Sequence, residues 1–278
     1  MKKALLLLVL IGWGASLYAS EPKFSEAIED NSFLIEEAYN QDKGVVQHIF
    51  GLLYFPTKPR DLFFSFTQEW PLPDQLNQFS YTLPFTFPQG QESGIGDLFL
   101  NYRRQILKEE NWLAFAPRLS LILPSGDVNK NLGYGTLGFQ VNLPFSKRWN
   151  NYLATHLNLG ATVLPAAEQV ISGQRVSKTL DSYNTGFSVI WLAQRRFNFL
   201  LEFTTTFGSE IDDDRNTNRF TQYVLNPGIR ASIPLGPLEI VPGLSFPLTW
   251  LKGNYQTGLF FYLSFEHPFL KNLPASSK

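Results

Sequence analysis

The chain has 278 residues, with 24 Asp and Glu against 23 Lys and Arg, and it contains no cysteine. The lack of cysteine excludes a disulfide framework and any thiolate metal site. The near-neutral charge offers no basic surface of the kind that binds nucleic acid. We therefore expect no nucleic-acid partner, no metal site and no cofactor.

The first twenty residues have the pattern of a secretory signal peptide. A basic start is followed by an apolar run from Ala4 to Gly14, and small residues lead to a cleavage site near Ala19 or Ser20. The apolar run is short for a spanning helix, and no later window holds about eighteen consecutive apolar residues. Residues 1–20 are therefore predicted to be removed on export.

Residues 21–44 form a polar and acidic stretch ahead of the first clear strand pattern. Within it, Asn31–Gln41 reads NSFLIEEAYNQ. This composition is compatible with a further strand, a plug inside a barrel or a periplasmic tail. We describe the stretch as an N-terminal periplasmic or plug segment, and the sequence leaves these alternatives open.

From residue 45 onward the dominant periodicity is two, with apolar and polar residues alternating as they do along β-strands. Most of these segments exceed the usual soluble strand of about 5–6 residues and match the roughly 9–11 residues that a tilted strand needs to cross a bilayer. Twelve segments follow this pattern, near residues 45–55, 61–71, 78–88, 94–107, 111–124, 134–147, 150–165, 178–193, 196–209, 218–234, 237–250 and 256–269.

The two faces of these strands predict a barrel in lipid. The apolar set faces hydrocarbon and the polar set lines the lumen, because Arg or Lys at the bilayer midplane on the lipid face would cost about 2–4 kcal/mol each. The predicted fold class is all-β, a transmembrane antiparallel β-barrel of about twelve strands over residues 45–269. Residues 270–278 are predicted to form a C-terminal tail.

The connections between strands alternate in character. Tight turns are predicted at 108–111, 148–151, 194–197 and 234–237, and long polar loops at 124–134, 165–179 and 209–218. Bacterial barrels have short periplasmic turns and longer outer loops, so the long loops are placed outside. The connection Pro71–Leu76 is an exception, because it must be periplasmic yet is six residues long.

Tryptophans cluster near strand ends. Ordinary core packing is one interpretation, and girdles at the two membrane interfaces are the favoured one. The residues concerned are Trp70, Trp112, Trp149, Trp191 and Trp250.

Several charged and aromatic residues fall on the predicted inner face of the barrel, and we take them as candidates for a ligand path. The arginines among them can pair with Glu202, Glu239 or Glu266. Such pairs can form a structural ladder or a selective constriction, and the structural role is favoured because paired buried charges need no ligand. The candidates are Arg103, Arg118, His156, Glu202, Arg230, Glu239, Tyr262 and Glu266.

Other chemical motifs are weak. The stretch 133–138 (GYGTLG) fits a dinucleotide fingerprint, but an alternating strand follows it where a helix is required. Alternate Asp and Asn residues in 212–218 lack the glycine and closing Glu of a calcium loop. His48, His156 and His267 show no metalloprotease spacing. A His–Ser pair assembled across strands, as in a barrel hydrolase, remains open.

Three segments resemble one family, the outer-membrane transporter-like proteins named for meta-pathway phenol degradation. They are Asn31–Ile49, Ser93–Gln105 and Leu119–Lys147. The most specific parts are a G-x-G-D strand opening and an LPSGD loop, carried by Gly94, Gly96, Asp97, Pro124, Gly126 and Asp127. The resemblance implies a barrel and uptake of small or aromatic compounds, with no catalytic residues to carry over. We interpret both motifs as turn and strand-edge determinants.

The predicted function is that of an outer-membrane channel or transporter for passive uptake of small solutes, aromatic compounds among them. The alternatives are a structural or adhesive outer-membrane protein with a plugged lumen, and a barrel hydrolase acting on lipid. With the channel function, the protein is predicted not to be an enzyme. Its expected partners are outer-membrane lipid, a small-molecule solute and the barrel-assembly machinery, in a Gram-negative-type envelope.

Overall fold

The structure is a computed structural model that describes residues 28, 30–57, 60–108, 110 and 112–269. The predicted signal peptide and the predicted C-terminal tail lie outside these residues. Within the described part, no helix is long and apolar enough to cross a membrane.

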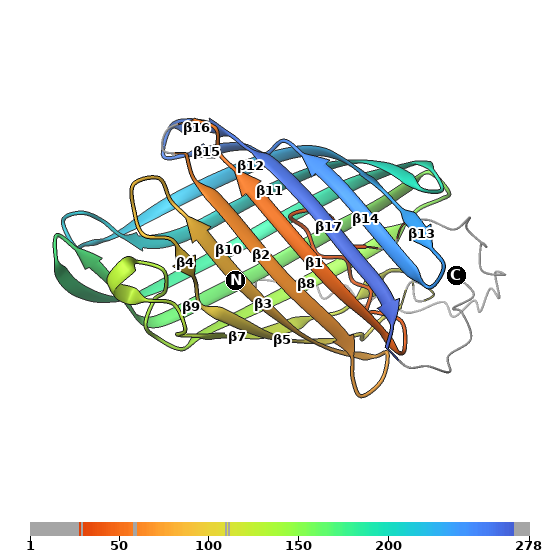
Figure 1. Ribbon diagram of the computed structural model, residues 1–278, viewed down its shortest axis with the longest axis horizontal. Coiled ribbons are helices and arrows are strands. Elements are labelled where there is room, and N and C mark those ends of the chain that lie inside the picture. The colour runs from red at the N-terminus through yellow and green to blue at the C-terminus, as the bar shows by residue number, and fades with distance from the viewer. Residues whose placement is uncertain (1–27, 29, 58–59, 109, 111, 270–278) are drawn as a thin grey trace, which may run out of the picture.

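The described chain forms a closed barrel of twelve antiparallel strands (Figure 1), which confirms the predicted fold class. β1 (Val45–Tyr54) pairs with β2 (Leu62–Pro71) on one side and with β17 (Leu259–Pro268) on the other, so the first and last strands close the barrel. The remaining segments are β3 (Asn77–Phe87), β4 (Gly94–Ile95), β5 (Leu98–Arg104), β6 (Ala114–Phe115), β7 (Arg118–Leu123), β8 (Gly138–Arg148), β9 (Leu153–Ile171), β10 (Gln174–Gln194), β11 (Phe197–Ile211), β12 (Thr217–Ala231), β13 (Ile233–Leu235), β14 (Leu238–Ser245), β15 (Leu248–Leu251) and β16 (Asn254–Thr257).

Some spanning strands are divided into two labelled segments where a residue interrupts the hydrogen-bond ladder. Pro117 separates β6 from β7, and Pro247 separates β14 from β15. Proline has no N–H to donate, so it breaks a ladder locally. At the second break the Gly258 N–H donates to the Pro247 carbonyl at 2.8 Å, which keeps the neighbouring strands together.

The outer surface of the barrel is apolar and its interior is polar. Along β11, Leu201 and Phe203 are 48% and 44% exposed, whereas Asn198 and Glu202 between and beside them are fully buried. A water-soluble protein arranges its side chains in the opposite way. The arrangement is that of a barrel whose outer face meets hydrocarbon and whose polar residues meet one another inside.

Exposed tryptophans mark the two ends of the barrel. Trp112, Trp149 and Trp191 lie at the end of the barrel where β1 begins and β17 ends, and Trp250 lies toward the opposite end. Each has an indole ring largely open to the surroundings. This distribution fits the aromatic girdles of membrane barrels.

The predicted loop over residues 165–179 is wrong. β9 continues to Ile171 and β10 begins at Gln174, so that only Ser172 and Gly173 form the turn, both with positive φ. The two strands project beyond their neighbours as a long hairpin (Figure 1). The polar composition of this stretch predicted a loop. A strand that extends past the membrane can have the same composition, because it needs no apolar face toward lipid.

Candidate functional site: the lumen and its inserted segment

Residues 30–44 lie inside the barrel, ahead of β1 (Figure 1). Their contacts run across the lumen from one wall to the other. Asp30 binds Tyr262 and Ser264 on β17, Ala38 binds Ser146 on β8, and Gln41 binds Gln78 on β3. We call residues 30–42 the inserted segment.

The barrel wall supplies acceptors for the backbone N–H groups of the inserted segment. The N–H groups of Leu34 and Ile35 donate to one carboxylate oxygen of Glu202, at 2.9 and 3.1 Å. The N–H of Glu36 donates to Asn158 Oδ1 at 2.9 Å. An enclosed segment without its own secondary structure needs such partners for its backbone N–H groups. The buried polar side chains of the wall provide them.

Two arginines supply donors to the segment's carbonyl groups. Arg230 donates to the carbonyls of Asp30 and Asn31, and Arg103 donates to those of Glu37 and Tyr39, at 3.1 and 2.6 Å. A guanidinium presents several N–H donors in a fixed plane, so one side chain can hold several carbonyls at once.

The ion pairs differ from the predicted ones. Arg118 pairs with Glu36 at 2.6 Å and Arg230 pairs with Glu37 at 3.2 Å, so both partners come from the inserted segment. Of the three predicted partners, Glu202 pairs with neither arginine, because its carboxylate accepts backbone N–H groups and the amide of Asn226. Glu36 and Glu37 lie ahead of the first strand, so a comparison of charges between strands does not identify them as partners.

The structure brings most of the predicted candidates to the inserted segment. Glu266 reaches it through Gln47, whose amide also donates to Asp30. Glu239 lies apart, where it accepts a hydrogen bond from Ser232 at 2.6 Å. The candidates in direct contact with residues 28–42 are Arg103, Arg118, His156, Glu202, Arg230 and Tyr262.

A serine and a histidine do meet across strands, as the hydrolase alternative requires. Ser146 Oγ lies 2.6 Å from His156 Nδ1, and His156 Nε2 lies 3.6 Å from Glu37. The pair is enclosed, however, with exposures of 1% and 2%, and Ser146 Oγ accepts the N–H of Ala38. A substrate would have to displace the inserted segment to reach this serine, so the pair serves here to hold the segment.

Glycines in the wall make room for the segment's apolar side chains. A Cβ atom at Gly243 or at Gly228 would overlap the ring of Phe33, and one at Gly186 would overlap Ile35. The ring of Phe33 also packs against those of Phe260 and Tyr262, with centroids 5.9 and 5.6 Å away. Strand periodicity does not indicate these contacts, although glycine inside a strand is itself a signal of close approach.

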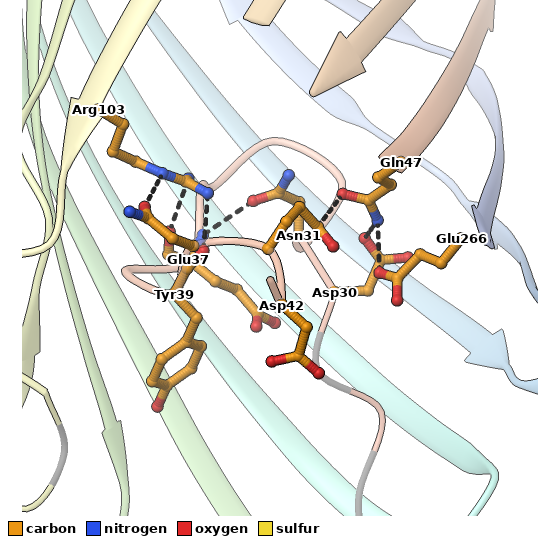
Figure 2. Close-up of a pocket in the computed structure, with 10 residues that line it drawn as sticks. Asp30, Asn31, Glu37, Tyr39, Asp42, Gln47, Arg103 and Glu266 are labelled. Atoms are coloured by element: carbon orange, nitrogen blue, oxygen red, sulfur yellow. Dashed lines mark hydrogen bonds between the residues drawn. The ribbon is translucent and has the colours of Figure 1, made fainter. Parts of the chain in front are cut away.

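The inserted segment carries its own carboxyl groups into the lumen (Figure 2). Burial raises the pKa of Asp30, although Arg230 and the hydrogen bonds from Ser264, Tyr262 and Gln47 oppose the shift. Burial also acts to raise the pKa of Glu36, but the Arg118 guanidinium outweighs it and holds that pKa below its usual value. The segment is therefore bound by charge as well as by backbone hydrogen bonds.

Cavities lie mainly on the outer side of the inserted segment. A cavity of about 710 Å³ opens among the outer loops, and a second of about 460 Å³ shares Gln140 and Thr162 with it and reaches Leu34 and Ile35. A third cavity of about 330 Å³ flanks the segment along β1, β2 and β3, where Glu69 and Ser80 line it, and one of about 40 Å³ lies beside Asp42 and Glu266 (Figure 2). The lumen is thus a wide outer vestibule above the inserted segment, with smaller cavities beside and below that segment.

The sequence motifs of the outer loops have structural roles. The Asp97 carboxylate accepts the N–H groups of Gly126 and Tyr134, at 2.9 and 2.8 Å. Asp127 caps a 3₁₀ turn by accepting the N–H of Asn129. A side chain at Gly133 would collide with Asp97 and with the backbone of Gly126. These residues fix the shape of a loop that lines the vestibule.

Comparisons with known proteins agree with this architecture. No family model and no curated protein matches the chain. The crystal structure of an outer membrane channel from Pseudomonas putida F1 is similar, with a TM-score of 0.64 at 14% identity over 86% of this chain and 99% of that one. The NanC porin structure matches with a TM-score of 0.44 at 10% identity, over 80% and 98%. At such low identity the similarity concerns the fold alone, which is that of an outer-membrane β-barrel.

Proposed function

We propose that this protein is an outer-membrane channel for passive entry of small solutes, closed at its periplasmic half by the inserted segment. The observation that carries the proposal is the asymmetric lumen. A vestibule of about 710 Å³ opens outward and adjoins a cavity of about 460 Å³, and residues 30–42 cross the barrel at the inner side of that second cavity. A barrel of twelve strands is wider than the side-chain-filled barrel of about eight strands, so removal of the segment leaves room for a pore.

The attachment of the segment is suited to a closure that can be released. Its wall contacts are individual hydrogen bonds and ion pairs, each with a net contribution of about 0.5–1.5 kcal/mol or somewhat more when charged. Gly44 and Val45 join the segment directly to β1, which is fixed in the barrel. A displaced segment therefore stays tethered at the periplasmic rim and can return.

The vestibule favours solutes with an apolar or aromatic surface. Its wall contains a cluster of apolar side chains that is unusual for a polar lumen, including Ile122, Leu164, Leu180 and Ile211. Gln140 and Thr162 add polar groups where the cavities meet. The resemblance to proteins named for phenol degradation supports the same class of small aromatic compounds.

Conductance through single barrels in a planar bilayer tests the proposal. A variant that lacks residues 30–41 should conduct steadily, whereas the intact chain should conduct little or only in brief openings. In the shortened variant an aromatic alcohol should interrupt the ion current more than a hexose at equal concentration. Equal, low conductance of the folded shortened variant and the intact protein would contradict a channel.

The same measurement addresses the structural alternative, a plugged barrel that acts through its outer loops. The long hairpin formed by β9 and β10 is the feature that favours it. If the shortened variant folds but stays closed, this alternative gains support. The hydrolase alternative finds no support in the lumen, because Ser146 and His156 are enclosed beneath the inserted segment.

A further inference from the structure

Two histidines face outward at the seam where the barrel closes. His48 lies on β1 and His267 on β17, and the register pairs Val46 with His267 and His48 with Phe265. The two imidazoles are thus diagonal neighbours on one face. Their chain neighbours Gln47 and Glu266 are buried on the lumen side, so the histidines point away from the lumen.

The two histidines are polar side chains within an otherwise aromatic part of the outer surface. The adjacent outward residues are aromatic, with the ring of Phe66 stacked on His48 at 6.3 Å and Phe50 next to both Phe66 and Phe265. An ionisable side chain on the outer face of a membrane-spanning element is costly unless it has a partner or a ligand. Each histidine here has the other as its partner.

The contact between them is made nitrogen to nitrogen. His48 Nε2 and His267 Nε2 are 3.2 Å apart. His267 Nδ1 lies 3.3 Å from the Pro268 carbonyl oxygen, an acceptor that favours the proton on Nδ1 and leaves the lone pair on Nε2. A backbone carbonyl behind the distal ring nitrogen is the support that metal-binding histidines commonly have.

The spacing also suits a metal ion. Two imidazole nitrogens that bind one tetrahedral Zn²⁺ at about 2.0–2.1 Å lie about 3.3 Å from each other, close to the observed 3.2 Å. A modest rotation of each ring would direct both lone pairs to one point between them. For this, His48 carries its proton on Nδ1 in place of Nε2, so no proton is lost or gained.

We propose that His48 and His267 form a binding site for one divalent ion of the zinc and copper class, for which imidazole is a preferred ligand. No group of three or more metal-ligating residues gathers among the residues that the structure describes, so water fills the other positions. Because the ligands come from the first and last strands, the bound ion ties the barrel seam at the periplasmic rim.

Copper binding to the refolded full-length barrel in zwitterionic detergent tests this site. The electron paramagnetic resonance spectrum of added Cu²⁺ should show one ion per barrel with two nitrogen ligands. His48→Gln and His267→Gln should each weaken binding on the order of tenfold or more. His156→Gln is the matched control, because the third histidine is enclosed in the lumen and its loss should leave the signal in place.

A second readout needs no variant. Zn²⁺ should shift the imidazole nitrogen resonances of two histidines in the intact protein, and should raise the temperature at which the barrel loses its compact electrophoretic form. The site is refuted if the intact protein binds no stoichiometric Cu²⁺ or Zn²⁺, or if the folded His48→Gln and His267→Gln variants bind as the intact protein does. Neither result depends on whether the lumen conducts.

Discussion

Single glycines decide how closely the inserted segment approaches the barrel wall. Gly243 is the cleanest case, because the atoms nearest to an added Cβ would be those of the Phe33 ring, and an aromatic ring cannot bend aside. At Gly186 the obstacle is the end of the Ile35 side chain, which can rotate. A methyl group at Gly243 therefore acts on the inserted segment more strongly than one at Gly186.

Gly243→Ala should loosen the inserted segment and raise the conductance of the barrel in planar bilayers. Adding Phe33→Ala to Gly243→Ala should remove the overlap and return the segment to the wall, although with less apolar contact. If Gly243→Ala alone folds normally and its conductance is unchanged, the inserted segment accommodates the methyl group without moving away from the wall. Gly186→Ala serves as the comparison and should have the smaller effect.

Glu202 is the second residue with a separable role. Because its carboxylate accepts two backbone N–H groups of the segment, Glu202→Ala should leave these groups unsatisfied, at about 1–3 kcal/mol each. Hydrogen exchange at Leu34 and Ile35 should accelerate accordingly. Thr206→Val, four residues farther along the same strand in the wall of the cavity of about 460 Å³, should leave the exchange of both amides unchanged, because their acceptor is Glu202.

The sequence could predict which side chains point inward but not what they bind. Alternation along a strand places Glu202 and Arg230 on the inner face from local pattern alone. Their partners, Leu34 and Asp30, lie 168 and 200 residues away in the chain, and no periodicity links such distant positions. Two features of the sequence do indicate a segment inside the barrel. The strands contain glycines, and they carry more inward polar side chains than pairing between the strands can satisfy.

At the scale of elements, the strands were predictable because each must show lipid an apolar face. The loops were not, because outside the membrane that requirement disappears. β9 and β10 illustrate this, since their polar outer parts are still paired as far as Ile171 and Gln174. The predicted loop over residues 124–134, in contrast, is irregular in the structure. Its shape depends on Asp97, which accepts hydrogen bonds from two of its backbone N–H groups.

Asp97→Ala should unfold that loop and leave the barrel intact. Both N–H groups that the carboxylate accepts would lose their partner, so the loop should become sensitive to added protease in outer-membrane vesicles. The transmembrane strands should keep their resistance to detergent, because their ladders do not involve Asp97. Asp213→Ala, in the β11–β12 turn, is the matched control. Cleavage at equal rates in both variants would refute the role of Asp97.

At the scale of the whole molecule, the distribution of side chains is inverted relative to a soluble protein. The enclosed interior contains Arg230 and Glu202, both nearly inaccessible, and the apolar rings of β11 lie outside. Burial of these charges is tolerated because each is paired or hydrogen-bonded. The outer rings are stable only where lipid covers them, so the barrel and the bilayer form one thermodynamic unit.

The cost of a charge on the outer face should therefore depend on its depth in the bilayer. Phe203→Arg, in the middle of β11, should lower the free energy of unfolding from lipid vesicles by about 2–4 kcal/mol, whereas Leu235→Arg at the periplasmic turn should lower it by only about 0–1 kcal/mol. Denaturant titration of tryptophan fluorescence in vesicles measures both values. Equal, small costs at the two positions would mean that water covers Phe203, which no barrel in lipid allows, and would remove the basis for a transmembrane channel.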